Sequence, residues 1–287
     1  MNKSSIIGSA LLALAAGMAS AAPDNAATPA PRELAVCADP ANMPFSNERR
    51  EGFENRIAQL VADDLHAELR YAWNLQRRSF LRRTLGAGAC DLVLGAPTGL
   101  QGLVTTRPYY RSTYVFVSLR SRGLGQVQSF DDPALGKLRI GLHALGAEGA
   151  NTPPAMALGR RGLGANVRGY PMWGEDSVED APGQLIDAVD KGEVDIAVVW
   201  GPFAGYYAQR HPGRLALVPA EPDGGEPALP VAYELAMGVR RGDTALRDEV
   251  QAVLDRRQAQ IQSILKDYGV PLLPVVAARA DEVSAPH

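Results

Sequence analysis

The chain has 287 residues, of which 46% are hydrophobic and 21% are charged, and its formal net charge is −3. This composition is typical of a globular protein with room for one large or two medium domains. The arginines are spread along the chain and form no basic stripe. We therefore expect no nucleic-acid partner and no docking to an anionic membrane surface.

The first 21 residues have the pattern of a secretory signal peptide. Lys3 precedes the apolar run "IIGSALLALAAGMA", and the small residues Ala19, Ser20 and Ala21 follow it. We expect cleavage after residue 21, with an uncleaved anchor as the alternative. Residues 22–32 then form a flexible leader, and the mature protein is exported, with no segment inserted in a membrane.

From residue 33 onward, strand and helix patterns alternate. Short apolar runs predict strands at 33–38, 68–73 and 91–96. Helical spacing of apolar residues predicts helices at 53–65 and 79–85. This alternation is typical of a parallel sheet covered by helices.

A long strand at 109–119 leads into a second series of the same kind. Its predicted strands are 137–142, 166–170, 194–200 and 214–220, and its predicted helices are 153–163 and 181–192. A further strand at 233–239 and two helical segments within 244–269 complete the chain.

Two stretches of the sequence share one pattern. "GACDLVLGAP" and "GEVDIAVVWGP" both place a glycine three residues before an aspartate that begins a buried strand. The pairs are Gly88 with Asp91 and Gly192 with Asp195. The repeat predicts an α/β fold of two lobes, each a mainly parallel sheet with flanking helices. Residues 33–118 and 236–287 would form lobe 1, and 119–235 would form lobe 2, with the strands at 109–119 and 233–239 crossing between them.

Cys37 and Cys90 are the two cysteines of the chain. Export permits a disulfide, but Cys37 lies late in its predicted strand and Cys90 just before another. In parallel strands these positions fall toward opposite ends of the sheet, whereas a disulfide needs Cα atoms within about 7 Å. We therefore predict two buried free thiols, with a disulfide as the alternative.

Ligands of open α/β sheets bind beyond the carboxyl ends of the strands, so two facing lobes predict a cleft there. The candidate cleft residues are Asp39, Met43, Phe45, Trp73, Gln76, Arg77, Arg78, Thr98, Tyr109, His143, Trp173 and Trp200. Pro40 and Pro44 would stiffen the first loop and present Asp39, Met43 and Phe45 to a partner. Tryptophans suit a flat aromatic ligand or a protein partner, and the arginine pair could clamp an anion.

Motifs of hydrolases, zinc proteases and P-loop proteins are missing from the sequence, and no Asp, Glu and His spacing predicts a metal site. Cofactors are not expected. Asp39 and Glu54 could serve as acid or base, so an enzyme such as a dehydratase or lytic transglycosylase stays an alternative. Without a partner base or metal, we expect no enzyme.

The sequence resembles the type II periplasmic solute-binding proteins, the family 3 fold that serves ABC importers of amino acids. "GFENRIAQLVADDL" and "GACDLVLGA", followed by "TTRPYYRSTYVFV", carry this resemblance, which covers most of residues 33–272. A narrower resemblance, to quinoprotein-dehydrogenase-associated proteins of the MoxJ/XoxJ type, rests on "VCADPANMPFSN", "GFEN", "QRRSF" and "LVTTRPYYRSTYVFV". Ser79 stands where that subfamily pattern has glycine.

The narrower resemblance implies a periplasmic accessory protein that binds or matures a PQQ-dependent alcohol dehydrogenase of the methanol type. The alternative is an ABC-transporter receptor for a small aromatic or anionic solute. Amino-acid receptors hold the ligand carboxylate with an arginine soon after the Gly-x-x-Asp strand and its ammonium with an acid in lobe 2. Here the first arginine is Arg107, and Trp200 occupies the place of the acid. An amino acid would thus lose both charge partners.

Overall fold

The computed structural model describes residues 32–77, 79–144, 152–172 and 181–275. The expected signal peptide and nearly all of the leader lie outside these ranges, and so do Arg78 and Trp173. The described residues belong to one compact unit. Among the described residues, no helix is both long and apolar enough to cross a membrane.

The predicted strands are present in the expected order, together with several short elements and one helix that the sequence did not predict. The strands are β1 (Glu33–Ala38), β2 (Ala41–Asn42), β3 (Ser46–Asn47), β4 (Glu68–Trp73), β5 (Leu92–Pro97), β6 (Leu103–Thr105), β7 (Tyr110–Leu119), β8 (Ile140–Ala144), β9 (Val167–Pro171), β10 (Ile196–Trp200), β11 (Leu215–Pro219) and β12 (Ala232–Arg240). The helices are α1 (Phe53–Asp64), α2 (Phe80–Arg83), α3 (Pro153–Arg160), α4 (Gln184–Asp190), α5 (Gly201–Ala208) and α6 (Thr244–Asp267). Short 3₁₀ turns lie at η1 (Arg120–Arg122), η2 (Pro133–Lys137), η3 (Gly164–Asn166) and η4 (Ala181–Gly183).

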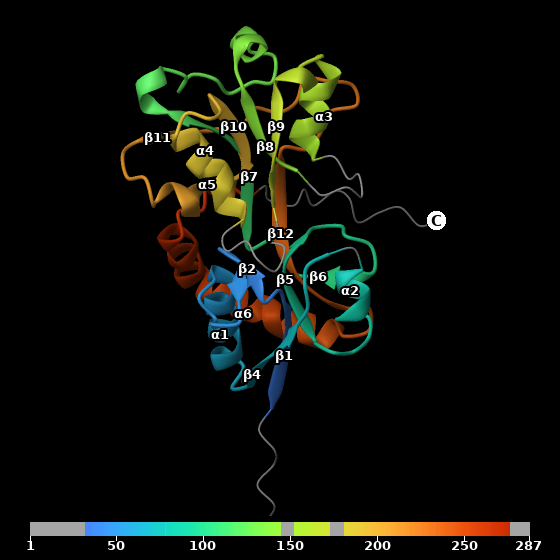
Figure 1. Ribbon diagram of the computed structural model, residues 1–287. Coiled ribbons are helices and arrows are strands. Elements are labelled where there is room, and N and C mark those ends of the chain that lie inside the picture. The colour runs from blue at the N-terminus through green and yellow to red at the C-terminus, as the bar shows by residue number, and fades with distance from the viewer. Residues whose placement is uncertain (1–31, 78, 145–151, 173–180, 276–287) are drawn as a thin grey trace, which may run out of the picture. The chain divides into compact units, whose positions relative to one another are not determined.

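The sheet has the strand order β4-β1-β5-β12-β7-β10-β8-β9 (Figure 1), with β6 paired to β12 and β11 paired to β7. β4, β1 and β5 run parallel, as do β10, β8 and β9. Between these two sets, β7 and β12 pair antiparallel to each other. We call the β4, β1, β5 and β6 side of the sheet, with its helices, the first half, and the β10, β8, β9 and β11 side the second half.

The crossing strands predicted at 109–119 and 233–239 are confirmed. β7 pairs with β12 through Tyr110–Thr113 and with β10 from Tyr114 onward. β12 continues from β7 to β5 and β6. Two parallel sets of strands joined by two long crossing strands agree with the α/β fold of two similar parts expected from the sequence. The lobe boundaries at residues 118–119 and 235–236 stay a prediction.

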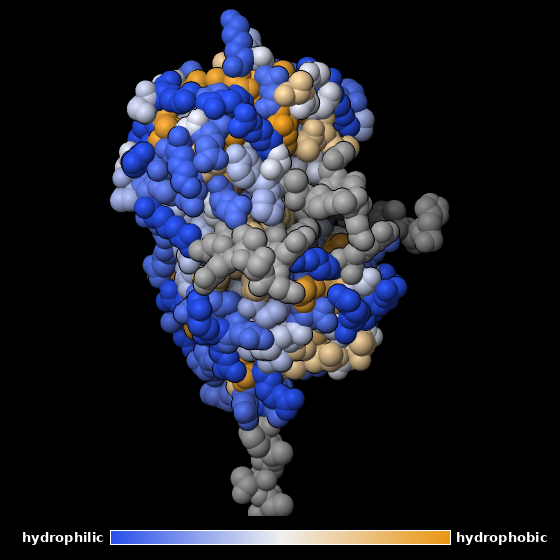
Figure 2. All heavy atoms as spheres, viewed as in Figure 1, coloured by the Kyte–Doolittle hydropathy of each residue, from blue (hydrophilic) through white to orange (hydrophobic). Residues whose placement is uncertain are grey.

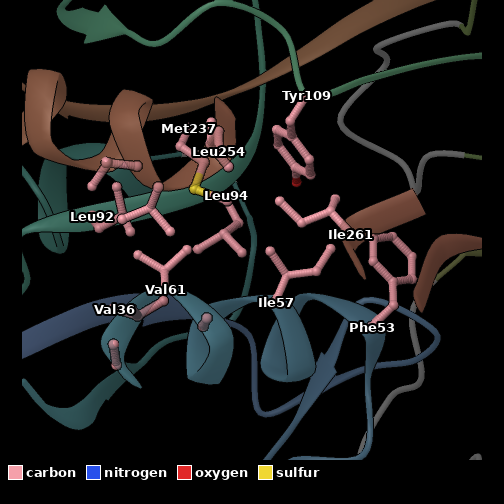
Figure 3. Packing of buried hydrophobic residues seen from close by; sticks show 14 of the residues in the cluster. Val36, Phe53, Ile57, Val61, Leu92, Leu94, Tyr109, Met237, Leu254 and Ile261 are labelled. Atoms are coloured by element: carbon pink, nitrogen blue, oxygen red, sulfur yellow. The ribbon is translucent and has the colours of Figure 1, made fainter. Parts of the chain in front are cut away.

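Helices cover both faces of the first half, because alternate strand residues point to opposite sides. Leu34 and Val36 of β1 pack with α1 and α6, in a cluster to which Phe53, Ile57 and Val61 of α1 belong. Figure 3 shows these α1 side chains reaching toward those of the strands and α6. Cys37, Val93 and Phe80 form a separate cluster on the opposite face, beside α2.

The second half is layered in the same way. Val115, Val117 and Val199 pack with α4 and α5, whereas Phe116 and Val198, next to them in sequence, pack on the other face with α3. On the face shown in Figure 2, hydrophilic residues cover most of the described surface, and apolar residues show in small patches. Most apolar side chains of the described residues are therefore buried in these internal layers.

Two helix predictions need correction. The chain at 244–269 forms one continuous helix, α6, because its polar stretch around Arg256 and Arg257 is solvent-facing surface, where both arginines pair with Asp64 of α1. No helix was predicted directly after the strand at 194–200, yet the sequence "GPF" there begins α5. Pro202 is tolerated there because the first turn of a helix needs no backbone N–H from it.

The repeated Gly-x-x-Asp pattern has the same structural use in both halves. Gly88 and Gly192 both have φ of +72°, a conformation that favours glycine. Asp91 then accepts a hydrogen bond from the Ala35 backbone N–H at 3.1 Å, and Asp195 accepts one from the Arg139 N–H at 2.8 Å. Each aspartate thus fastens its strand to the neighbouring chain segment.

The prediction of two free thiols is wrong, because Cys37 and Cys90 form a disulfide with their Cα atoms 5.4 Å apart. The error lay in the assumed strand register. β5 pairs with β1 only through Val36 with Leu92 and Cys37 with Val93, so β5 begins beside the end of β1. Cys90 therefore comes near Cys37, and both side chains belong to the cluster beside α2.

Candidate functional site

The loop after β1 is fastened to the loop after β4. Asp39 is buried, and its carboxylate accepts hydrogen bonds from the backbone N–H groups of Ala41 at 2.8 Å and Gln76 at 2.6 Å. The Asn42 side chain donates to the Gln76 side-chain oxygen at 2.9 Å. The structure thus brings the predicted residues Asp39 and Gln76 together, with Asp39 bracing the loop from inside.

Met43 and Phe45 touch the second half. The Phe45 ring lies 5.0 Å from the ring of Phe53 and 5.2 Å from the ring of Phe203 on α5. The Tyr207 hydroxyl, also on α5, donates to the Met43 carbonyl at 3.3 Å. The loop expected to present these residues to a partner therefore also holds the two halves together.

Trp200 sits where the halves meet. It ends β10, pairs in register with Tyr114 of β7, and packs against both core clusters adjoining the junction. Its ring lies 5.4 Å from that of Tyr114 and 5.6 Å from that of Tyr233, edge-on to both. Three partly exposed aromatic rings thus gather at the carboxyl end of β10. We call these residues the aromatic trio.

A hollow of about 320 Å³ lies at the crossing strands, which is at the small end of the range for ligand pockets. Its lining residues are Pro97, Thr98, Arg111, Ala232, Tyr233 and Glu234. The Thr98 N–H donates to the Glu234 carbonyl at 3.0 Å, and Glu234 is opposite Arg111 in the sheet register. The hollow therefore combines an aromatic ring with side chains of both charges.

Trp73 and Arg77 are not among the residues that line this hollow. The Trp73 ring stacks on that of Tyr71 with centroids 4.4 Å apart, and the Arg50 guanidinium lies 5.2 Å from the Tyr71 ring. Arg77 is partly buried, and its backbone N–H donates to the Leu75 carbonyl at 2.8 Å. The predicted pairing of Arg77 with Arg78 lies partly outside the described residues.

His143 is a buried, neutral side chain. Its Nε2 lies 2.9 Å from the Pro182 carbonyl oxygen, so Nε2 carries the proton and donates it. Burial lowers the pKa of His143 to about 4, although the Pro182 hydrogen bond opposes this shift. The ring packs edge-on against Phe203 at 5.5 Å, which places the predicted residue beside the Phe45 contact.

Tyr109 and Glu54 lie on the first-half side of the junction. Tyr109 is buried, and its hydroxyl accepts a hydrogen bond from the Gly95 N–H at 3.2 Å. Glu54 reaches over Gly95 so closely that a Cβ there would lie 2.3 Å from Glu54 Oε1. Burial raises the pKa of the Glu54 carboxyl to about 8, so it is mostly protonated at neutral pH.

Arg107 has a partner away from the hollow, as its Nη2 donates to both carboxylate oxygens of Asp255 on α6, at 2.8 and 2.7 Å. It therefore does not replace the arginine of the amino-acid receptors. Within the described ranges, no cluster of three or more His, Cys, Asp or Glu side chains has the arrangement of a metal site.

Sequence reasoning missed the contribution of the crossing strands. Tyr114, Tyr233, Arg111 and Glu234 line the junction, and Phe203 reaches it from α5. The available signal was the pair of long strands, because their central residues must lie where the halves meet. Finding individual side chains there would have required the register between β7 and β12.

No protein-family model matches this sequence. It is 30% identical over 257 residues to a protein named MoxJ from Methylorubrum extorquens, an alignment that covers 87% of this chain and 85% of the relative. The crystal structure of the periplasmic binding protein XoxJ from Methylobacterium extorquens AM1 matches with a TM-score of 0.68 and 35% identity, over 84% of this chain and 99% of that one. The crystal structure of MxaJ from Methlophaga aminisulfidivorans MPT matches with a TM-score of 0.74 and 29% identity, over 84% of this chain and 100% of that one.

Proposed function

This chain belongs to the MoxJ family of periplasmic binding proteins, and on that premise we propose that it is a periplasmic accessory protein of a PQQ-dependent, methanol-type alcohol dehydrogenase. It engages or helps to mature the enzyme through the junction of its two halves. The mature chain follows cleavage of the signal peptide predicted at residues 1–21.

The observation that carries this proposal is the aromatic trio of Trp200, Tyr114 and Tyr233. Trp and Tyr are enriched among the residues that contribute most to protein–protein affinity. Trp200, one of the trio, stands at the place where the amino-acid receptors are expected to carry an acid. A partly exposed aromatic surface supports docking of another protein better than capture of a free amino acid.

The electrostatics of the junction point the same way. A bound amino acid brings a carboxylate and an ammonium, and burying either without a partner is strongly unfavourable. Arg107 is held by Asp255, and Trp200 replaces the acid. This arrangement supports a role other than the import of common amino acids.

Retention of the dehydrogenase from periplasm on the immobilised mature protein tests the proposal. We compare wild type with Thr98→Arg, which fills the hollow from an exposed position, and with Gln126→Arg, which adds the same charge on the exposed loop before η2. Wild type and Gln126→Arg should retain the enzyme, and Thr98→Arg should not.

The experiment distinguishes a wrong accessory role from a wrong docking site. If neither wild type nor Gln126→Arg retains the dehydrogenase, or changes its activity or PQQ content, the accessory role is refuted. If Thr98→Arg retains it as well as wild type does, the enzyme binds this protein elsewhere than the hollow.

The second candidate function is a receptor for a small aromatic or anionic solute. The hollow favours it, because Arg111 and Tyr233 line it together. Ligand at a hundred times its Kd stabilises the folded state by about 2.7 kcal/mol. A metabolite panel that raises the melting temperature of wild type and not of Thr98→Arg would support this reading, and a panel without effect would refute it.

A further inference from the structure

Glu54 is held in place by the way α1 begins. The helix starts at Phe53, directly after Gly52, whose backbone passes so close to Phe45 that an added Cβ would lie 2.0 Å from the Phe45 carbonyl oxygen. The Glu54 N–H donates to that carbonyl at 2.9 Å. These contacts fix the first turn of α1, and its second residue reaches β5 over Gly95.

Gly95 provides the space that the carboxyl group occupies. Its φ is +65°, and β5 is out of register with β12 at this point, as in a β-bulge. Any side chain here would meet Glu54 Oε1. The bulge therefore gives the carboxyl group a notch at the carboxyl-terminal part of β5, the end of the sheet where α/β proteins bind ligands.

Two tyrosine hydroxyls accompany this carboxyl group. Tyr109 accepts from the Gly95 N–H, and its ring points from the start of β7 into the cluster shown in Figure 3. Tyr110 is 1% exposed, and its hydroxyl has no hydrogen-bond partner among the described residues. Burial raises the pKa of both hydroxyls, and the nearby Glu54 raises it further. Buried hydroxyls without a partner are uncommon, which points to a missing one.

A positively charged group would suit both Glu54 and the Tyr110 hydroxyl, which has no hydrogen-bond partner among the described residues. No arginine, lysine or histidine of the described residues pairs with Glu54, and burial is the cause of its raised pKa. A partly buried acid without a counter-charge is disfavoured in its ionised form, and an opposite charge offsets that cost. Tyrosine rings add an attraction for cations.

We propose that Glu54, with the hydroxyls of Tyr109 and Tyr110, forms a binding site for the primary ammonium group of a ligand. A primary ammonium has three N–H donors, which match the three acceptor groups of Glu54, Tyr109 and Tyr110, whereas a divalent metal needs more oxygen ligands. The ammonium belongs either to a free amine or to a lysine side chain of another protein. This inference does not rest on the proposed function.

Binding of a cation at this site displaces a proton, because Glu54 is protonated below pH 8. The groups that face Glu54 do not compete in this range. Tyr109 and Tyr110 on β7 and its approach, and Tyr71 on β4, all have pKa values raised by burial and stay neutral. Tyr268, which packs on Phe53 from the end of α6, is raised in the same way. Affinity should therefore rise with pH up to about 8 and then level off.

Isothermal titration calorimetry of the mature protein with n-butylammonium tests the proposal. At pH 6.5, titrations in two buffers of different ionisation enthalpy should show close to one proton released per ligand bound. Glu54→Gln should bind at least about tenfold more weakly and release no proton. Glu48→Gln, an exposed acid in the preceding loop, is the matched control and should behave as wild type.

A second titration uses Nα-acetyl-lysine methylamide, which has the ammonium group of a protein lysine. Binding of n-butylammonium identifies a free amine as sufficient, and binding of the lysine derivative alone identifies a protein lysine as the source. The proposal is overturned if neither compound binds, if n-butanol binds as well as n-butylammonium, or if a folded Glu54→Gln binds like wild type. Circular dichroism of the variant establishes that it is folded.

Discussion

The ring of Phe45 lies 5.2 Å from the ring of Phe203, nearly at a right angle to it, and this contact joins the loop after β1 to α5 of the second half. Phe45 belongs to the border of both adjoining core clusters. A residue expected at a partner surface is therefore also part of the packing between the halves.

Replacing Phe45 by alanine should lower the free energy of unfolding by about 2–4 kcal/mol, because it removes a ring packed between Phe53 and Phe203. Urea denaturation of the mature protein measures this change. Leu100→Ala, at an exposed position, is the control and should change stability by less than about 0.5 kcal/mol. A Phe45→Ala protein as stable as this control would show that Phe45 serves only as a contact surface.

The alternation of strands and helices could be predicted from sequence because each element leaves a periodic pattern that needs no tertiary information. The bounds of β1 and β4 agree with the predicted runs 33–38 and 68–73. Short elements such as β2, β3 and β6 leave no such pattern. α5 was not predicted, because the proline in "GPF" is typical of a strand end, although a proline can equally begin a helix.

The candidate site could be predicted only in part, because strand ends can be placed from sequence but strand registers cannot. Trp200 and Thr98 do lie at the junction and its hollow. The prediction of two free thiols failed for the same reason, because the stagger of β5 along β1 decides whether Cys37 and Cys90 meet. The contacts of Asp39 depend on hydrogen bonds with a loop 37 residues away, which no local pattern contains.

Loss of the Cys37–Cys90 disulfide should destabilise the protein by about 2–4 kcal/mol, because the bridge closes a loop across a sequence separation of 53 and so restricts the unfolded chain. Guanidinium denaturation with and without dithiothreitol measures the effect on wild type. The Cys37→Ala, Cys90→Ala double variant should match reduced wild type and ignore the reductant. Equal stability of oxidised wild type and the double variant would contradict this prediction.

Glu54 should make stability fall as pH rises. Its pKa is raised from 4.5 to about 8 in the folded state, so the folded protein holds a proton that the unfolded chain has lost. This contribution is fully present below pH 4.5 and is lost as pH rises toward 8, at up to about 1.4 kcal/mol per pH unit. Glu54→Gln should abolish this slope in urea titrations between pH 6.5 and 8. An unchanged slope in the variant would refute the assignment.

The lowered pKa of His143 makes the stability of the fold rise with pH, which is opposite to the effect of Glu54, and it does so at lower pH. Its folded pKa is lowered from 6.5 to about 4, so its contribution to stability is present above pH 6.5 and is lost as pH falls toward 4. Below pH 6.5 the Glu54 and His143 effects therefore oppose each other. Glu54→Gln should consequently lose stability on acidification from pH 6.5 to 4.5, whereas the Glu54 effect offsets this loss in wild type. A Glu54→Gln protein that gains stability over this range would contradict the His143 shift, and curves parallel to wild type would contradict the Glu54 shift.

The two aspartates of the Gly-x-x-Asp repeat should differ in how much they stabilise the fold. Asp195 has a side chain 9% exposed and binds the guanidinium of Arg139, with Arg122 also in contact, whereas the Asp91 side chain is 35% exposed and pairs with Arg240. The Arg139 hydrogen bonds are the main cause that lowers the pKa of Asp195 to about 2.

Asp195→Ala should therefore cost about 1.5–3 kcal/mol, because it leaves the part-buried Arg139 N–H without its charged acceptor, and Asp91→Ala should cost less. Chemical denaturation at pH 7 compares the two variants, and Asp132→Ala, at the start of η2, reports the loss of a simple capping bond, about 1 kcal/mol. The stability that Asp195 adds is present above pH 3.8 and is lost as pH falls through about 2. Equal losses in Asp195→Ala and Asp91→Ala would mean that the burial of the aspartate does not determine how much its bonds stabilise the fold.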